Sequence, residues 1–139
     1  MILLLPTVKH TGSHFVLKQL LPDFEQMNLK DIDNLDPDKN IVIFDHLYPS
    51  KMDLWEPLMA KYPAIIPLRN KQDIMESWER REEPIDDFFD QWQILGRMRK
   101  YKVYFINLDA PKFRRMQLRR INQELDLNLD PGKWEKIRA

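Results

Sequence analysis

Four short, unbroken apolar runs, separated by stretches with helical periodicity, restrict the fold of this chain more than any other feature. The runs cover residues 2–5, 41–44, 64–68 and 103–108. Apolar runs of this length, without alternating polar residues, are typical of strands that are covered on both faces. Such strands separated by helices predict an α/β fold, here a single three-layer domain with a mainly parallel sheet.

Helices are predicted where apolar residues recur at intervals of three and four. The expected helices cover residues 13–24, 50–62, 71–81, 85–95 and 112–125. The pair Leu21-Pro22 is expected to end the first helix early, and Ser50 is expected to cap the second. Residues 29–40 are polar and contain turn signals, so a loop is expected there.

The composition and charge of the chain limit the classes of protein to which it can belong. With 43% apolar and 32% charged residues, the 139 residues are expected to form one ordinary soluble domain. The formal net charge is zero, so neither nucleic acid nor an acidic membrane is expected as a partner. No apolar run approaches the roughly 20 residues of a membrane span. The apolar start is also too short for a signal peptide, and a cytoplasmic location is expected.

Cysteine is absent, which excludes disulfides, thiolate chemistry and cysteine-based zinc sites. The charge is unevenly distributed, since most charged residues in the segment 73–90 are acidic and most in the segment 97–138 are basic. One interpretation of these blocks is that they form solvated helix faces. The other places the basic C-terminal third beside an anionic ligand.

A polar loop with one glycine lies between the first apolar run and the first helix. It reads Lys9-His10-Thr11-Gly12-Ser13-His14. A loop in this place directs backbone N–H groups inward and suits a phosphate or a sulfate, so a P-loop-like phosphate-binding loop is predicted after the first strand. The alternative is a simple turn that needs one glycine. The loop does not fit a Walker A motif, because Ser13 and His14 follow Gly12 where that motif has Lys and Ser or Thr.

A second candidate phosphate site follows the third apolar run. Arg69 comes directly after this run, and Ser77 follows eight positions later on a predicted helix. A guanidinium group can hold a phosphate through two parallel charge-assisted bonds. The alternative for Arg69 is a surface ion pair with Asp73 or Glu76. Because ligands of parallel sheets bind outside the carboxyl ends of the strands, both candidate sites are expected at one edge.

In these motifs the chain resembles the PAPS-dependent sulfotransferases, as an unusually short member. PAPS is 3′-phosphoadenosine 5′-phosphosulfate, and PAP, the nucleotide that remains after transfer, is 3′-phosphoadenosine 5′-phosphate. The family's Lys/Arg-Ser/Thr/Gly-Gly-Thr loop compares with His10-Thr11-Gly12-Ser13. Its strand-end Arg-Asn/Asp-Pro, with Ser eight residues after the Arg, compares with Arg69-Asn70-Lys71 and Ser77. Its Thr-His-Leu-Pro-like segment compares with Asp45-His46-Leu47-Tyr48-Pro49, and its late Gly-Asp-Trp-Lys segment with residues 132–136.

The resemblance implies that residues 1–139 form a sulfotransferase-like nucleotide-binding domain. PAPS would donate a sulfuryl group to a hydroxyl or amine of an unidentified small-molecule or carbohydrate acceptor, leaving PAP, and no metal is expected. His46 would be the catalytic base, since an imidazole titrates near neutrality. His10 or Lys9 would stabilise the leaving phosphate. The nucleotide-binding residues implied are Lys9, His10, Thr11, Gly12, Ser13, His14, Phe15, Arg69 and Ser77, with Phe15 in the position where cytosolic members place a Trp near the adenine.

The sequence departs from the family in places that leave alternatives open. His10 stands where the family has Lys or Arg, and Lys71 stands where it has Pro. A P-loop-like nucleotide kinase or nucleotide-binding module would use Asp45 as a magnesium ligand. A non-catalytic interaction protein that keeps the sulfotransferase fold is a further alternative. A zinc site of three histidines is less favoured, and a homodimer that completes the acceptor site stays open.

Overall fold

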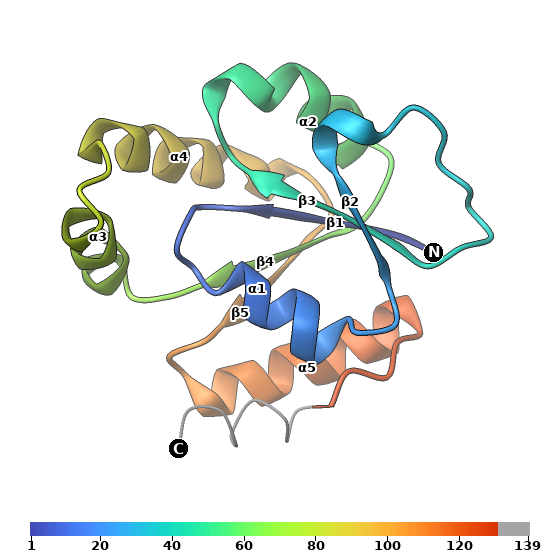
Figure 1. Ribbon diagram of the computed structural model, residues 1–139. Coiled ribbons are helices and arrows are strands. Elements are labelled where there is room, and N and C mark those ends of the chain that lie inside the picture. The colour runs from blue at the N-terminus through green and yellow to red at the C-terminus, as the bar shows by residue number, and fades with distance from the viewer. Residues whose placement is uncertain (131–139) are drawn as a thin grey trace.

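The computed structural model describes residues 1–130 and contains a five-stranded sheet with helices on both faces (Figure 1). The strands are β1 (Ile2–Thr7), β2 (Glu25–Asn28), β3 (Ile41–His46), β4 (Ala64–Leu68) and β5 (Val103–Asn107). Their order across the sheet is β2-β3-β1-β4-β5, and every neighbouring pair is parallel. The predicted α/β fold with a parallel sheet is therefore confirmed.

The strand β1 lies at the centre of the sheet, and this position explains its unbroken apolar run. All six of its residues are buried, because β3 and β4 flank it and helices cover both of its faces. Its register with β3 runs from Ile2 opposite Ile41 to Thr7 opposite His46. The last pair is polar, and it marks the point where the sheet reaches the carboxyl edge.

The edge strand β2 was not predicted from the sequence, which gave four strands. Its residues are Glu25-Gln26-Met27-Asn28, and they are mostly exposed to solvent. The strand pairs only with β3, so it forms through backbone hydrogen bonds and buries little side-chain surface. Without an apolar run or an alternating pattern, the sequence carries no signal for such a strand.

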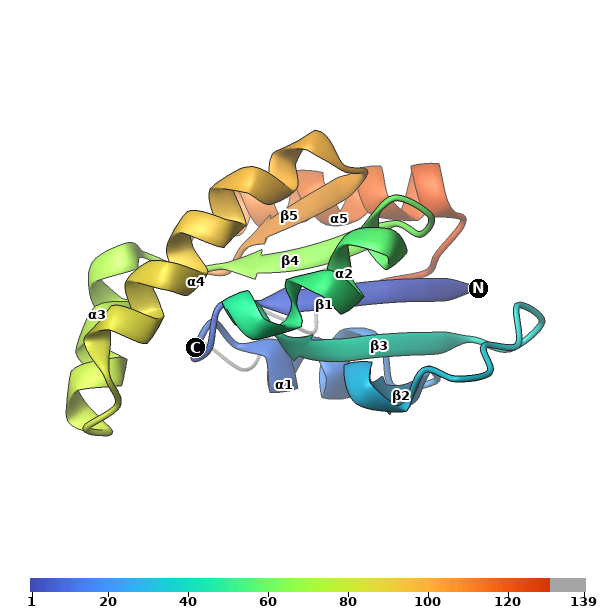
Figure 2. The ribbon, with the colours of Figure 1, turned by 90° about the horizontal axis from the view of Figure 1, so that it is seen from above.

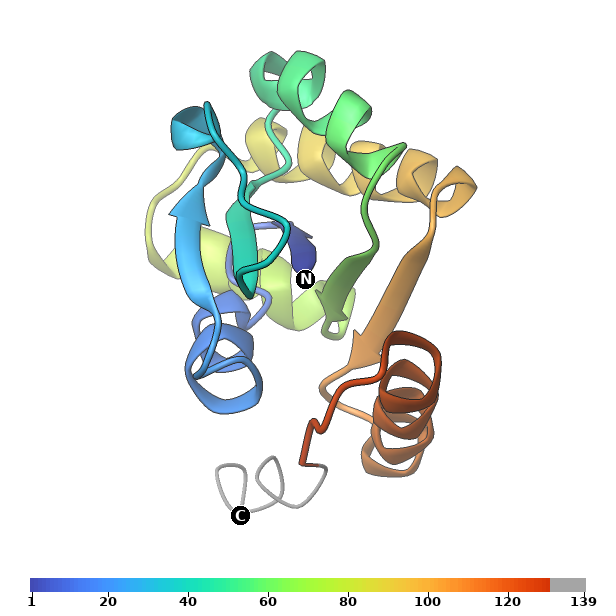
Figure 3. The same ribbon diagram turned by 90° about the vertical axis from the view of Figure 1, so that its right-hand side faces the viewer.

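The domain has five α-helices in its described part, and four of them form the two layers that cover the sheet. The five α-helices are α1 (Ser13–Phe15), α2 (Met52–Met59), α3 (Lys71–Arg80), α4 (Ile85–Arg97) and α5 (Pro111–Leu125). Helices α1 and α5 cover one face of the sheet, and α2 and α4 cover the other (Figures 1 and 3). Helix α3 lies beyond the carboxyl ends of the strands (Figure 2).

The first two helices differ in detail from the prediction, one in its helix type and the other in its start. The first helix continues from α1 as a π-helical turn, Val16–Leu20, and ends before Leu21-Pro22 as expected. Ser50 does not cap the second helix. It lies inside a 3₁₀ turn, Pro49–Lys51, and α2 begins at Met52 after an N-cap residue, Lys51, that makes no side-chain capping bond. Among the described helices, none is both long and apolar enough to cross a membrane.

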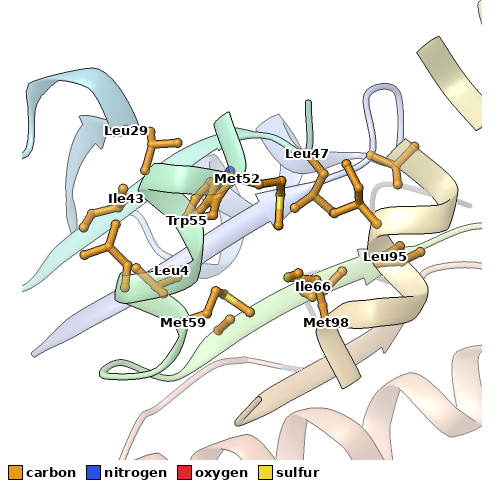
Figure 4. Close-up of a cluster of buried hydrophobic side chains, with 14 of the residues drawn as sticks. Leu4, Leu29, Ile43, Leu47, Met52, Trp55, Met59, Ile66, Leu95 and Met98 are labelled. Atoms are coloured by element: carbon orange, nitrogen blue, oxygen red, sulfur yellow. The ribbon is translucent and has the colours of Figure 1, made fainter. Parts of the chain in front are cut away.

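Each face of the sheet has its own hydrophobic core. On the side of α2 and α4, Trp55 is fully buried among residues that include Leu4 and Ile66 (Figure 4). On the side of α1 and α5, Leu3 and Leu5 pack with residues of both helices. Alternate residues of β1 thus contribute to opposite cores, as strand geometry requires.

The topology opens a crevice at the carboxyl ends of β1 and β4. These strands are neighbours in the sheet, but the chain leaves β1 toward the α1 face and leaves β4 toward α3 and the opposite face. Neighbouring strands whose connections diverge in this way leave space between the two loops. The loop after β1 and the first residues after β4 therefore face each other.

The loop after β1 requires glycine at residue 12. The φ angle of Gly12 is 90°, and a Cβ atom built there would lie 2.6 Å from Cδ1 of Leu108. His10 also has a positive φ of 70°, a conformation that costs free energy in a residue with a side chain. The turn therefore depends on a glycine and on contacts that hold His10 in place.

Two matched substitutions test this requirement. We expect Gly12→Ala to lower the free energy of unfolding by about 1–3 kcal/mol, because it adds backbone strain and a clash. Gly96, in α4, has no atom within 4 Å of a built Cβ. Gly96→Ala should therefore raise the free energy of unfolding by about 0.5–1 kcal/mol through helix propensity. Urea unfolding at pH 7 measures the free energy of unfolding of both variants. A value for Gly12→Ala equal to that of the wild type would contradict the loop geometry.

Candidate functional site

A cavity of about 330 Å³ lies at the carboxyl edge of the sheet, and most of the predicted site residues line it. They come from four separate parts of the chain: the loop after β1, the end of β3, the residue after β4, and α3. Its lining consists of Lys9, His10, Gly12, Ser13, His14, His46, Arg69, Ser77 and Arg81. Residues separated by up to 72 positions in sequence thus meet in one place.

Two of the predicted residues, Thr11 and Phe15, do not line this cavity. Thr11 is buried, and its hydroxyl donates a hydrogen bond of 2.7 Å to the carbonyl oxygen of Val8. Thr11 therefore supports the loop from inside. Phe15 is partly buried against the core between the sheet and helices α1 and α5.

Three side chains from other elements hold the backbone of the loop. The Gln91 side-chain oxygen accepts a bond of 2.9 Å from the N–H of Lys9. The Trp78 indole N–H donates one of 3.1 Å to the carbonyl oxygen of Lys9. Arg69 donates one of 3.2 Å to the carbonyl oxygen of His10. Helices α3 and α4 and the end of β4 thus fix the conformation of the loop before any ligand arrives.

The sequence contains a signal for Gln91 outside the motifs. Gln91 lies three positions after Phe88 and four before Leu95, on the apolar face of α4, and it is fully buried. A polar residue at such a position needs a buried hydrogen-bond partner. Arg81 was also missed, although it follows Ser77 by four residues and therefore shares its helix face.

The backbone N–H groups of residues 11–14 are available to a ligand. Within residues 1–130, none of these four groups donates a hydrogen bond. Consecutive N–H groups in a turn with left-handed residues form a concave site for anions. The hydroxyl of Ser13, next to Gly12, lies in the same cavity lining.

The side chains of the cavity make it cationic. Lys9, Arg69 and Arg81 all line it. The Nε atom of Arg69 is buried without a hydrogen-bond partner, which leaves a donor of the guanidinium group unused. An anion with several oxygen atoms would satisfy that donor and the loop N–H groups together.

One carboxylate already contacts this cationic region. Glu83, in the connection between α3 and α4, pairs with Lys9 Nζ and with His10 Nε2. Burial alone would raise the pKa of Glu83, but the hydrogen bonds from Lys9 and His10 outweigh it and lower the pKa. The hydrogen bond to Glu83 also raises the pKa of Lys9. Both partners are therefore charged at neutral pH, and Glu83 occupies an anion position beside the loop.

His46 contributes an uncharged group to the cavity. The register that pairs Thr7 with His46 brings Thr7 Oγ1 to 3.0 Å from Nδ1 of the imidazole. Within residues 1–130, Nε2 has no hydrogen-bond partner. Burial lowers the pKa of His46 to about 4, assisted by the nearby charge of Lys9 and Lys51 and opposed by that of Asp45. His46 therefore titrates far below neutrality, in contrast to the expectation for an ordinary imidazole, and is neutral at pH 7.

Asp45, the predicted magnesium ligand of a kinase, is already engaged. Its Oδ1 atom lies 2.6 Å from Lys51 Nζ and accepts a bond of 2.8 Å from the N–H of His46. In residues 1–130 there is no group of three or more His, Asp or Glu residues placed to hold a metal ion. The segment 132–136, compared above with a late family motif, lies outside the described residues.

Comparisons with protein-family models, with curated proteins and with solved structures gave no match to this chain.

Proposed function

We propose that the cavity binds PAPS and its product PAP, and that the protein transfers a sulfuryl group from PAPS to a hydroxyl or amine. The observation that supports this most is the convergence of two anion-binding groups in one cavity. One is the loop with free N–H groups at residues 11–14, and the other is Arg69 with Ser77 and Arg81. A nucleotide with phosphate groups at both the 5′ and 3′ positions matches two such groups.

Each anion-binding group suits one end of the nucleotide. The loop after β1 offers N–H groups and the Ser13 hydroxyl, which suit the 5′-phosphosulfate. Arg69 and Arg81 offer guanidinium groups, and Ser77 adds a hydroxyl, which together suit a phosphate dianion. Ser77 is 7% exposed, so a bond between its hydroxyl and a phosphate would be formed largely away from water. Shielding strengthens charge-assisted bonds.

The transfer step follows from the position of His46. The acceptor oxygen or nitrogen attacks the sulfur atom and forms a new bond to it. The bond between sulfur and the 5′-phosphate oxygen breaks, and its electron pair leaves with PAP. The acceptor proton passes to Nε2 of His46, the ring nitrogen without a partner in the described chain. Lys9 and His10, at the start of the loop, stabilise the charge that develops on the departing phosphate.

The contacts of Glu83 favour a second candidate, a nucleotide-binding protein that does not transfer sulfate. Lys9 and His10 both contact this carboxylate, so the charge of Lys9 is partly compensated before a ligand binds. Catalysis would require the phosphosulfate to compete with Glu83 for these groups. Nucleotide binding through Arg69 and Arg81 would not require competition with Glu83. Measurements of binding and of transfer therefore separate the two candidates.

Arg69 tests the nucleotide assignment. Arg69→Ala should weaken PAP binding by about tenfold to a hundredfold, the loss expected for hydrogen bonds to a charged group. AMP, which lacks the 3′-phosphate, should lose less affinity. Arg69→Lys should restore binding only in part, because an ammonium group cannot make the two parallel bonds. Calorimetric titration at fixed ionic strength measures each affinity.

Arg80→Ala is the matched control for Arg69→Ala, because it removes the same charge from a neighbouring exposed arginine that does not line the cavity. Its PAP affinity should equal that of the wild type. Equal losses of PAP affinity in the Arg69 and Arg80 variants would mean that only the net charge matters, and the assignment of Arg69 would be wrong.

His46 separates an enzyme from a binding protein. His46→Ala should leave PAP affinity within a few-fold of the wild type and lower sulfate transfer by about 10²–10⁴-fold. Only the neutral imidazole accepts a proton, and its pKa is about 4. The contribution of His46 to the rate should therefore be constant from about pH 6 to 8 and decline only as the pH approaches 4.

His46→Asn serves as the second variant, since an amide can keep the hydrogen bond to Thr7 but cannot take up a proton. It should be as inactive as His46→Ala. Activity of His46→Asn near that of the wild type would show that His46 is structural. A wild type that binds PAP but transfers nothing to phenols, sugars or amines would favour the non-catalytic candidate.

A further inference from the structure

A second cavity, of about 360 Å³, lies at the carboxyl ends of β4 and β5, beneath α4. Its apolar and aromatic walls are formed by Leu68, Trp92, Leu95 and Phe105. Polar side chains line the rest of the cavity, among them Arg69, Arg99, Asn107 and Asp109. This volume falls within the range of about 300–1,000 Å³ that is typical of small-molecule sites.

The two cavities are neighbours, and Arg69 lines both of them. The first lies over the ends of β1 and β3, and the second over the ends of β4 and β5, so they follow one another along the same edge of the sheet. A ligand with a phosphate at Arg69 in the first cavity therefore has the second cavity within reach.

We infer that the second cavity binds the heteroaromatic base of the nucleotide whose phosphates bind in the first. This inference depends on the proposed function. Trp92 and Phe105 provide aromatic surface, on which a base can stack. The guanidinium group of Arg99 lies 5.7 Å from the centre of the Phe105 ring, so a planar cation also borders the cavity. The side-chain amide of Asn107 carries both a donor and an acceptor, as the edge of a base does.

This location differs from the one that the sulfotransferase resemblance implies. The resemblance places the adenine near Phe15, on the helix after the loop. Phe15 lines neither cavity and packs against the core on the α1 and α5 side. The aromatic groups that adjoin Arg69 instead come from α4 and β5, so recognition of the base would involve elements that carry none of the family motifs.

Gly96 allows the second cavity to be filled without a clash. It lines the cavity from α4, and a Cβ atom built on it meets no atom within 4 Å. Gly96→Phe should place a ring in the space that the base would take. Gln93→Phe adds the same side chain to an exposed position of α4 outside the cavity and is the matched control.

The experiment titrates each protein with PAP and with ribose 3,5-bisphosphate, which has both phosphates but no base. In the wild type, PAP should bind at least about tenfold more tightly than the base-free compound, as expected for one stacked base. Gly96→Phe should lose this advantage and bind the two compounds with similar affinity. Gln93→Phe should behave as the wild type does.

Each contrary result has a distinct meaning. If the wild type binds both compounds equally well, or if Gly96→Phe keeps the preference for PAP, the base does not bind in the second cavity and the inference is wrong, while the proposed phosphate site stands. If the wild type binds neither compound, the proposed function fails and the inference fails with it. The comparison of PAP with ribose 3,5-bisphosphate in the wild-type protein does not require any variant to fold.

Discussion

The site depends on the way in which the backbone of Lys9 is held. Both of its backbone polar groups are bonded to buried side chains, its N–H to Gln91 and its carbonyl oxygen to Trp78. These two partners belong to α4 and α3, so the loop after β1 is attached to a helix of the opposite face of the sheet and to the helix beyond the strand ends. The attachment stabilises the left-handed conformations of His10 and Gly12, which would otherwise be costly. A loop fixed in this way presents its free N–H groups without an ordering cost on binding.

The cavity combines a charged side and a neutral side. Lys9 in the loop is charged and pairs with Glu83, which also contacts His10. His46 is buried near Lys9 and Lys51, and burial together with these charges keeps its imidazole neutral at pH 7. A neutral acceptor of protons next to a cationic anion site is the arrangement that transfer from an anionic donor to a hydroxyl requires.

The sequence was sufficient to predict the parts of the molecule that depend on local pattern. Central strands are unbroken apolar runs, so β1, β3, β4 and β5 were predictable, whereas the solvated edge strand β2 has no pattern of its own. Parallel strands bring their carboxyl ends to one edge, and this places Arg69, His46 and the glycine loop together without further information. The supporting side chains could not be predicted in the same way, because the contacts of Gln91 and Glu83 with the loop join residues more than 70 positions apart. The pKa of His46 likewise depends on burial and on charges from other segments.

We propose that one cavity recognises two phosphate groups of one nucleotide, and calorimetric titration of the wild-type protein with PAP, AMP and ATP with magnesium, at one ionic strength, examines this proposal. PAP should bind at least about tenfold more tightly than AMP, since charge-assisted bonds to the 3′-phosphate contribute about 1.5–3 kcal/mol. PAP should also bind without magnesium. Equal affinity for PAP and AMP, or binding of ATP with magnesium alone, would show that the cavity does not recognise the second phosphate.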